Sequence, residues 1–481
     1  MSHHSSSAAT ATQEPISTVR DNKISRLPQQ TPATNSVATD HQGYRRYWDE
    51  VETLPRPQLE ALQLSRLQAL IRHAYDHSPY YREAFTQAGV TPDEVQTLDD
   101  LRRFPFVDKQ VERARQAAAP LLGDMLAVPE EQVVFVSASS GSTGVPTLSP
   151  FSAADFDRFQ DIQARLFWAT GMRPTDRYVH ALNFTLFVGG PDVIGAQKLG
   201  ALCFWAGTVP SDRLLYIMKE FQPTVTWTTP SYAWHLGETA KAQGLDPRQD
   251  LALKRIIVCG EPGGSIPETR QGIEALWGAE VHDFYGISDI YGACAGTCEA
   301  HDGLHLVEDD ILLEVLDPAT DQPVAEGEPG EMVLTTLTKQ ARPMIRFRTG
   351  DIIVANKAPC ACGRTHVRIK VTGRKDDMFI VSGVNVFPSD VEAVVRATEG
   401  LNGEYRITLY EEEHLTRFDI EVERSADSAS EDIDLEARLR HDIKTRLGVR
   451  PKQVLIRAPE SLPRHTHKAK RVIDTRAACS L

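Results

Sequence analysis

The feature that most constrains the fold is a regular alternation of apolar and amphipathic segments between residues 155 and 276. Short apolar runs have the length and composition of buried strands, and they lie at Tyr178–Leu182, Thr224–Thr228 and Ile256–Cys259. Helical periodicity predicts helices at Asp155–Phe167, Val193–Leu199, Ser211–Lys219, Tyr232–Ala242 and Pro267–Leu276. This alternation predicts the βαβ units of an α/β protein, in which ligands bind beyond the carboxyl ends of the strands.

The flanking segments differ from this pattern. Leucines near helical spacing predict helices from Tyr44 to about Ala118, with a break at His77–Tyr81. After Leu304, short β segments predict a barrel-like or distorted sheet subdomain, and they lie at Ile311–Leu316, Gly330–Leu337 and Asp351–Val354. Residues 1–40, rich in Ser, Thr, Ala, Gln and Pro, are expected to form a disordered tail.

Length and charge exclude several classes of protein. A chain of 481 residues is too long for one compact core, so two or three domains are expected. The net charge of -14 argues against a nucleic-acid partner and against an anionic membrane surface. Every apolar run is shorter than the ~20 residues of a membrane span, and the N-terminus lacks a hydrophobic signal core, so we expect a cytoplasmic protein. Seven scattered cysteines favour free thiols or a metal site over a disulfide framework.

A loop dense in Ser, Thr and Gly follows a predicted strand, from Val136 to Thr147. Small residues let backbone N–H groups and hydroxyls converge on an anion, so this loop is a candidate phosphate cradle. It is not of the Walker type, because Gly144 follows Gly141 too early and precedes Val145-Pro146 in place of Lys-Ser/Thr. The alternative is a flexible polar surface loop.

Two aspartates are candidate ligands for a nucleotide and its metal ion. Tyr285–Asp289 places the Ser288 hydroxyl beside Asp289 after an apolar strand, and a carboxylate near phosphates is what Mg²⁺ requires. Arg346–Asp351 places Asp351 at a tight turn, where it could accept hydrogen bonds from a ribose diol. The alternative for each is an ordinary turn aspartate.

The C-terminal part contains two charged stretches. Val371–Glu392 predicts a charged turn, a pair of β segments and a helix that starts at Pro388-Ser389. Leu462–Val472 is a basic segment after a proline, for which the default interpretation is a solvated charged loop.

Together these stretches resemble the adenylate-forming superfamily, and within it phenylacetate-coenzyme A ligase and its relatives that act on aryl acids. The resemblance covers the chain from about Tyr44 to its end. The stretches that carry it occur in the order of the family, and they are Ser139–Thr147, Thr229–Tyr232, Gly260–Pro262, Tyr285–Asp289, Arg346–Asp351, Gly373–Asp377, Gly383–Ser389 and Lys468–Val472.

The resemblance implies a two-step reaction. A carboxylate attacks the α-phosphate of ATP to give an acyl-adenylate and pyrophosphate, and a thiol such as that of coenzyme A then displaces AMP. The loop residues implied to hold the β,γ-phosphates are Ser139, Ser140, Ser142, Thr143 and Gly144. The residues implied around the nucleoside and Mg²⁺ are Gly260, Glu261, Pro262 and Tyr285 at the base, Asp351 at the ribose, Arg374 at the ribose or phosphate, and Asp289 with Ser288 at the metal.

The catalytic cation implied by the resemblance is Lys468, on a small α+β C-terminal domain that rotates about the position of Asp376 between the two half-reactions. We therefore expect a large N-terminal domain at residues 41–374 and a small mobile domain at residues 375–481. Three positions depart from the family pattern: Val145 stands in place of Lys, Asp289 in place of Glu, and His467 in place of the Gly before the catalytic lysine.

The resemblance also outlines an acyl pocket. Its predicted residues are Phe184, Phe187, Gly189, Asp192, Tyr232, Gly286 and Ile287. Asp192 is expected either to receive an amino or hydroxyl substituent, as on an aminobenzoate, or simply to cap the next helix. We expect an aryl acid, with coenzyme A, a carrier-protein thiol, or an amine or hydroxyl as the acceptor. A nucleotide-binding relative without turnover is the alternative from another class, and the family suggests a homodimer.

Cysteines and a histidine form a second candidate site. Cys360-Ala-Cys362 and the segment Cys298–His305 bring together thiolate and imidazole ligands that zinc favours. Some relatives have similar residues, so Cys298, His305, Cys360 and Cys362 are interpreted as a structural zinc site. The alternative is reduced cysteines and surface histidines in loops.

Overall fold

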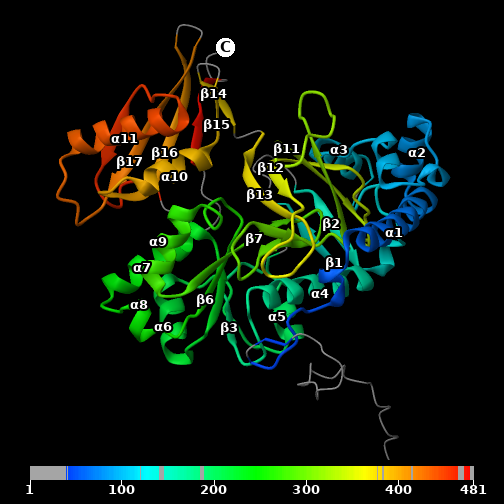
Figure 1. The fold of residues 1–481 in the computed structure, drawn as a ribbon, viewed down its shortest axis with the longest axis horizontal. Helices are drawn as coiled ribbons and strands as arrows, with labels where there is room; N and C mark the ends of the chain where they lie inside the picture. The colour runs from blue at the N-terminus through cyan, green and yellow to red at the C-terminus, as the bar shows by residue number, and fades with distance from the viewer. Residues whose placement is uncertain are drawn as a thin grey trace, which may run out of the picture.

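The computed structural model describes residues 39–40, 42–119, 121–139, 146–184, 189–375, 378–381, 384–412, 415–463 and 471–476 (Figure 1). The expected tail at residues 1–40 falls almost entirely outside the described residues.

The N-terminal part is helical, as its leucine spacing predicts. Its helices and 3-10 turns are η1 (Glu50–Thr53), α1 (Arg56–His77), α2 (Pro79–Ala88), η2 (Pro92–Glu94), η3 (Leu98–Arg103), α3 (Lys109–Ala118) and η4 (Glu130–Gln132). The predicted break is confirmed, because α1 ends at His77 and α2 begins at Pro79 after the N-cap Ser78. The apolar face of α1 is buried in the main core through Leu67, Leu70 and Ile71.

The alternating segment forms the parallel half of a large sheet. Its strands, in spatial order, are β4 (Leu202–Trp205), β3 (Arg177–His180), β5 (Val225–Thr228), β6 (Arg255–Cys259) and β7 (Glu280–Ile287). The helices are α4 (Ala153–Ala169), α5 (Val193–Leu199), α6 (Ser211–Phe221), α7 (Pro230–Ala242), α8 (Pro247–Asp250) and α9 (Pro267–Trp277). Each predicted strand and helix of this segment is therefore confirmed, with ends that shift by a few residues.

Helices cover both faces of the parallel strands. Ile257 of β6 belongs to the same core cluster as α4 and α5, whereas its neighbours Ile256 and Val258 pack with α6, α7 and α9. Successive side chains of a strand point to opposite faces, and a sheet covered on both sides needs apolar residues at every position. This explains the continuous apolar run of β6.

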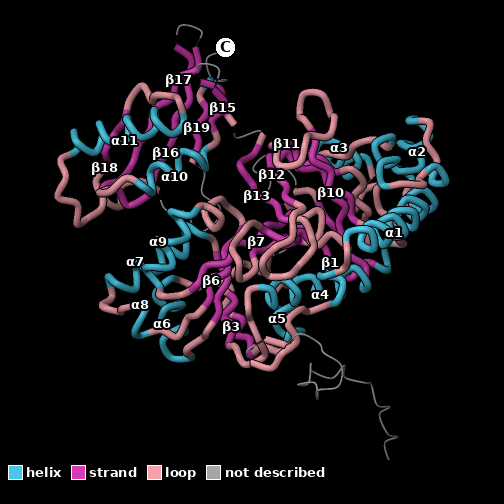
Figure 2. The backbone as a smooth tube through the Cα atoms, in the orientation of Figure 1, coloured by secondary structure: helices cyan, strands magenta, loops and turns pink. Residues whose placement is uncertain are grey.

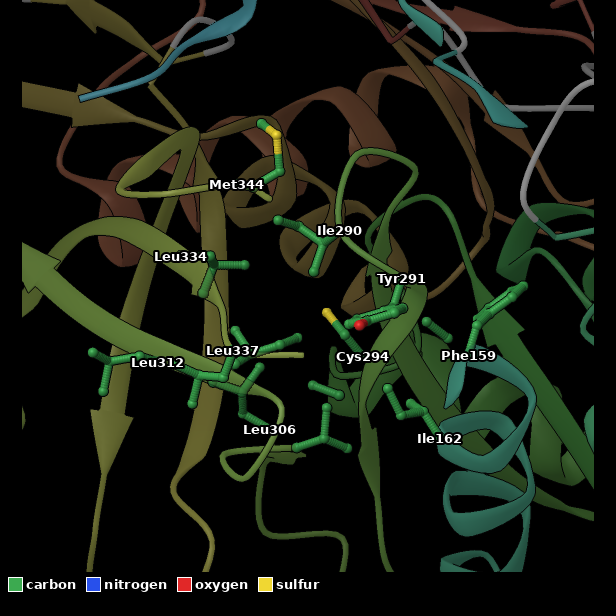
Figure 3. Close-up of a cluster of buried hydrophobic side chains, with 14 of the residues drawn as sticks. Phe159, Ile162, Ile290, Tyr291, Cys294, Leu306, Leu312, Leu334, Leu337 and Met344 are labelled. Atoms are coloured by element: carbon green, nitrogen blue, oxygen red, sulfur yellow. The ribbon is translucent and has the colours of Figure 1, made fainter. Parts of the chain in front are cut away.

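The β-rich segment continues the same sheet. Strand β7 pairs antiparallel with β8, and the order then runs through β8 (Gly292–Thr297), β9 (Leu304–Leu306), β13 (Arg368–Arg374), β12 (Phe347–Asn356), β11 (Pro329–Thr336) and β10 (Ile311–Leu316). The predicted distorted sheet is therefore hydrogen-bonded to the parallel strands in one eleven-stranded sheet. Figure 3 shows the core beside this junction, where Cys294 and Tyr291 lie near Phe159 and Ile162 of α4.

A smaller α+β unit follows, with a hydrophobic core of its own. Its elements are β14 (Phe379–Val381), β15 (Val384–Val386), α10 (Pro388–Ala397), β16 (Leu401–Glu412), β17 (Leu415–Arg424), α11 (Asp432–Leu447), β18 (Val454–Arg457) and β19 (Val472–Asp474). Strands β18, β17, β16 and β19 form one sheet, against which α10 and α11 pack through Val391, Val395 and Leu439. Figure 2 shows this unit on the side of α9, and the Ser389 hydroxyl of α10 donates to the Thr372 carbonyl of β13 at 2.7 Å.

Across the described helices, none is both long and apolar enough to span a membrane.

Candidate functional site

The ends of the predicted phosphate loop are joined by a two-stranded antiparallel pair, β1 (Val133–Ala138) and β2 (Leu148–Ser152). The Ser139 amide donates to the Thr147 carbonyl at 3.0 Å, and the two hydroxyls lie 2.7 Å apart. The Ser137 hydroxyl donates to the Ser288 carbonyl, so the strand before the loop lies beside the segment that carries Asp289. The predicted loop residues Ser140, Ser142, Thr143 and Gly144 lie outside the described residues.

Asp289 lies in a buried cluster of charges. Its carboxylate contacts Lys109 Nζ at 2.5 Å and Arg342 Nη2 at 3.3 Å. Glu112 joins the cluster through Arg342 at 2.8 Å and through Lys109 at 3.2 Å. The predicted metal ligand is therefore of the right chemical type, but both of its oxygens are paired with cations.

Lys339 binds the backbone of Asp289 and of the next residue. Its ammonium donates to the Ser149 hydroxyl at 2.7 Å and to the carbonyls of Asp289 and Ile290 at 2.9 and 2.8 Å. Burial, followed by the charge of Arg342, lowers the pKa of Lys339 to about 7.

The sequence reasoning missed Lys109, Glu112, Arg342 and Lys339. Lys339 and Arg342 lie shortly before the Arg346–Asp351 stretch but belong to none of the motifs, so the sequence alone does not single them out. Lys109 and Glu112 look like ordinary surface residues of an amphipathic helix, and only the fold brings them to Asp289.

The structure brings three predicted nucleotide residues together. Asp351 on β12 pairs in register with Arg374 on β13, and Arg374 Nη1 donates to its Oδ1 at 2.9 Å. The Tyr285 hydroxyl at the end of β7 donates to the other oxygen, Oδ2. Burial, and next the charge of Asp351, raise the pKa of Tyr285 well above its usual value, so this tyrosine keeps its proton and remains a donor.

The glycine turn after β6 lies at the same edge of the sheet. Gly260 adopts φ +86°, and a side chain built there would meet nothing within 4 Å. Glu261 accepts a hydrogen bond from the Ser231 amide at 2.8 Å, which links this turn to the first turn of α7. Gly260 and Pro262 are exposed, so the turn borders open space at the carboxyl end of β6.

The predicted acyl-pocket residues lie in several different surroundings. Phe184 stacks on Trp205 with ring centroids 5.5 Å apart and lies 5.0 Å from the His180 ring, near the ends of β3 and β4. Tyr232 instead packs against the cluster of α6, α7 and α9, and its hydroxyl lies 3.1 Å from that of Ser211. Of the remaining residues, Ile287 packs against the main core, Gly286 lies against the Gly292 backbone, Gly189 lies near Leu182, and Phe187 is outside the described residues.

Asp192 is the unusual member of this set. It is 1% exposed, it makes no capping bond to the described first turn of α5, and its Oδ1 has no hydrogen-bond partner among the residues that the structure describes. Burial raises its pKa well above the usual value.

The four predicted zinc ligands come together. Cys298 follows the last residue of β8, His305 lies on β9, and Cys360 and Cys362 lie between β12 and β13. All four are buried, and their ligand atoms lie within 4.8 Å of one another. The Nδ1 atom of His305 lies 3.0 Å from the His366 carbonyl, which leaves Nε2 facing the thiols.

The fold and these side chains define a two-domain, nucleotide-binding α/β enzyme. In agreement, residues 57–337 match the AMP-binding enzyme family and residues 383–476 match the AMP-binding enzyme C-terminal domain.

Individual relatives narrow this class. The chain is 36% identical over 451 residues to phenylacetate-coenzyme A ligase of Thermus thermophilus, covering 89% of this chain and 99% of that protein. It is 35% identical to phenylacetate-coenzyme A ligase of Escherichia coli, covering 89% and 97%. The chain therefore belongs to the phenylacetate-coenzyme A ligase family, whose members are AMP-forming acid–thiol ligases.

Solved structures give the arrangement of the two domains. The structure of 2-hydroxyisobutyryl-CoA ligase in the postadenylation state with 2-HIB-AMP aligns with a TM-score of 0.86 at 33% identity, covering 94% of this chain and 95% of that one. The same ligase in the thioesterification state with 2-HIB-AMP and CoA gives 0.68 at 34% identity, covering 93% and 95%. This chain thus resembles the postadenylation arrangement more closely.

Proposed function

We propose that this protein activates an aryl carboxylic acid with ATP, releases pyrophosphate, and transfers the acyl group from the acyl-adenylate to coenzyme A. The observation that carries the proposal is the convergence of Tyr285, Asp351 and Arg374 at one edge of the sheet. The family relatives support both half-reactions.

The main obstacle in the first step is crowded negative charge, because a carboxylate must approach a triphosphate. In the proposed site Asp351 accepts the ribose hydroxyls, Arg374 lies at the ribose or phosphate, and Tyr285 lies against the base. Gly260, Glu261 and Pro262 border the adenine, and Ser139 begins the loop that holds the phosphates. Mg²⁺ would neutralise phosphate charge when bound, with the Asp289 carboxylate as its protein ligand and Ser288 beside it.

We place the domain boundary at Arg374–Asp376, after the last residue of β13. The catalytic cation Lys468 and the pivot Asp376 lie outside the described residues, and their roles follow from the family resemblance. Val145 and His467, two of the departures from the family pattern, also lie outside them.

The acid that we propose is an aryl acid carrying a hydrogen-bond donor, such as an amino- or hydroxybenzoate or a substituted phenylacetate. The unpartnered Oδ1 of buried Asp192 supports this choice, because a buried acceptor without a donor costs about 1–3 kcal/mol. A donor on the substrate would remove that cost.

The deciding experiment measures pyrophosphate release with a panel of benzoates and phenylacetates, with and without amino or hydroxyl groups, followed by mass spectrometry for the CoA thioester. Release with aryl acids and formation of the thioester are expected. Release without thioester would indicate a carrier-protein thiol or an amine or hydroxyl acceptor. No release with any aryl acid would contradict the proposal and favour another acid or a nucleotide-binding relative without turnover.

We further propose that Cys298, His305, Cys360 and Cys362 hold a structural zinc ion. Tetrahedral zinc with Zn–S bonds of about 2.3 Å places two sulfurs about 3.8 Å apart and a sulfur and a nitrogen about 3.5 Å apart. The Cys298–Cys360 sulfurs are 3.8 Å apart, and Cys362 Sγ lies 3.4 Å from His305 Nε2. Four protein ligands close the site, so zinc would stabilise the loop between β12 and β13 and would not take part in the reaction. Elemental analysis should find about one zinc per chain.

A cytoplasmic location and a homodimer stay predictions.

A further inference from the structure

A groove of about 690 Å³ lies between α1, η3 and the edge strand β10, which Figure 2 shows beside α1. The loop between β10 and β11 forms one wall of it through residues 323–328. None of the residues placed at the nucleotide, the acid or the zinc ion lines this groove. Hollows of this size are large enough to bind a ligand, so the groove is a candidate site separate from the one that carries the reaction.

The floor of the groove is apolar. Leu64 of α1, Leu98 of η3 and Val315 of β10 line it, and each is only partly buried although it packs against the main core. Apolar area that stays in water costs about 25 cal/mol per Å² relative to the same area covered. An occupant with apolar side chains is therefore favoured.

Strand β10 is the outermost strand of the large sheet, so one of its edges faces no other strand. The loop after it folds back on that edge for a short distance: the Val324 amide donates to the Val315 carbonyl at 3.1 Å, and Pro323 bridges to Leu316. Residues two apart on a strand turn their backbone groups the same way, so Leu313 faces this edge too. Beyond the ladder with β11, no backbone group of the described residues bonds its amide or carbonyl. Leu313 is therefore an open pairing position that lines the groove.

Six of the lining residues are acidic and three are basic, but several of these charges are already paired. Arg56 contacts Glu308 at 2.8 Å, and Arg102 contacts Asp99 at 2.9 Å. Glu314 is neutralised by an arginine outside the groove at 3.0 Å. These pairs contribute little net charge to the rim.

The remaining charges of the rim are exposed, and they are Glu60, Glu326, Glu328 and Lys357. None of them makes an ion pair with another residue in the described part of the chain. Three carboxylates against one ammonium leave the rim with a net charge of -2. Electrostatic complementarity therefore favours a cationic partner.

We propose that this groove binds an extended, basic peptide segment of a partner protein. The segment pairs its backbone with β10 at Leu313, turns alternate apolar side chains onto Leu64 and Leu98, and places its basic side chains against Glu326 and Glu328. An added strand gains affinity from main-chain hydrogen bonds and specificity from alternate side chains. A small organic cation would match the rim but would leave the strand edge unpaired. The inference goes beyond the proposed function and does not depend on it.

The test measures fluorescence anisotropy of a labelled hexapeptide of alternating lysine and valine with the full-length protein. This peptide should bind, with an affinity that falls as salt is raised, and a peptide of alternating glutamate and valine should not. Glu326→Lys combined with Glu328→Lys should weaken binding roughly 10-fold or more. The matched control is Glu130→Lys combined with Glu131→Lys, because these two glutamates are exposed and lie outside the groove. No binding of the basic peptide, or an equal loss in both double variants, would overturn the inference.

A second measurement separates strand pairing from charge attraction alone. Methylation of the amide nitrogens of all valines, or of all lysines, removes the donors along one edge of the extended peptide and keeps its charge. One of these two peptides should bind roughly 10-fold or more weakly than the unmodified one. Equal binding by all three would refute pairing with β10. A wild-type dimer in sedimentation velocity that the groove variant dissociates would assign the groove to a second copy of this chain instead.

Discussion

Lys339 gives a prediction whose sign and size follow from its surroundings. Its ammonium is fully buried among Ser149 and two carbonyls, and its pKa is about 7 against an ordinary lysine value of 10.5. Between these two pH values the unfolded chain keeps the proton and the folded protein loses it. The free energy of unfolding therefore rises with pH over this window, because the unfolded state binds more protons.

The size of this effect follows from the two pKa values. From pH 7 to pH 9 the folded protein releases most of its proton while the unfolded chain retains nearly all of it, which amounts to about 2 kcal/mol. Lys339→Met removes this contribution, so the stability of the variant should rise by about 2 kcal/mol less over the same range.

Urea unfolding at pH 7, 8 and 9, followed by tryptophan fluorescence, measures the difference. The variant starts from a lower stability, because three oxygens lose their donor, but the test lies in the slope against pH. Lys198→Met, on the surface, should keep the wild-type slope. Equal slopes for the wild type and Lys339→Met would show that Lys339 stays charged in the folded protein and would refute the reasoning.

Three other changes have expected outcomes. Asp351→Ala should weaken binding of ATP and of AMP alike by roughly 10-fold or more in titration calorimetry, since both share the ribose; an effect confined to ATP would contradict the ribose role. Asp192→Asn should lower kcat/KM for amino- or hydroxy-substituted acids more than for the unsubstituted acid in the pyrophosphate assay, and an equal loss would mean a structural role. Trp234→Ala removes the ring under the Arg396 guanidinium, which lies 4.7 Å from the ring centroid and links α7 to α10. Because this is one of the contacts between the two domains in the present arrangement, the adenylation half-reaction should slow more than thioester formation, and an even loss in both would argue against that role.

Much of the fold could be predicted from the sequence because local patterns dominate it. The apolar run of β6 and the exact predicted bounds of α5 follow from periodicity and from the closing Gly200. The union of parallel and antiparallel strands in one sheet could not be predicted, because it depends on the β7–β8 pairing and the tight approach of Gly286 to Gly292.

The residues of the candidate site likewise divide into those that sequence motifs predict and those that only the fold brings together. Asp351 and Tyr285 are predictable because short motifs carry them, and the structure indeed brings them together. Lys109 and Arg342 come from segments without a motif, and their contact with Asp289 depends on tertiary packing. Asp192 was expected either to meet a substituent or to cap α5, and only the absence of a capping bond within the described turn separates these interpretations.

Arg374, whose guanidinium donates to Asp351, is the last residue of β13 and lies opposite Asp351 in the register of β12 and β13. The chain that leads to the C-terminal core leaves the large sheet at that same residue. The proposed rotation of the C-terminal domain would therefore move Arg374 relative to Asp351, so release of AMP and rotation of that domain would be coupled and hard to change separately by mutation.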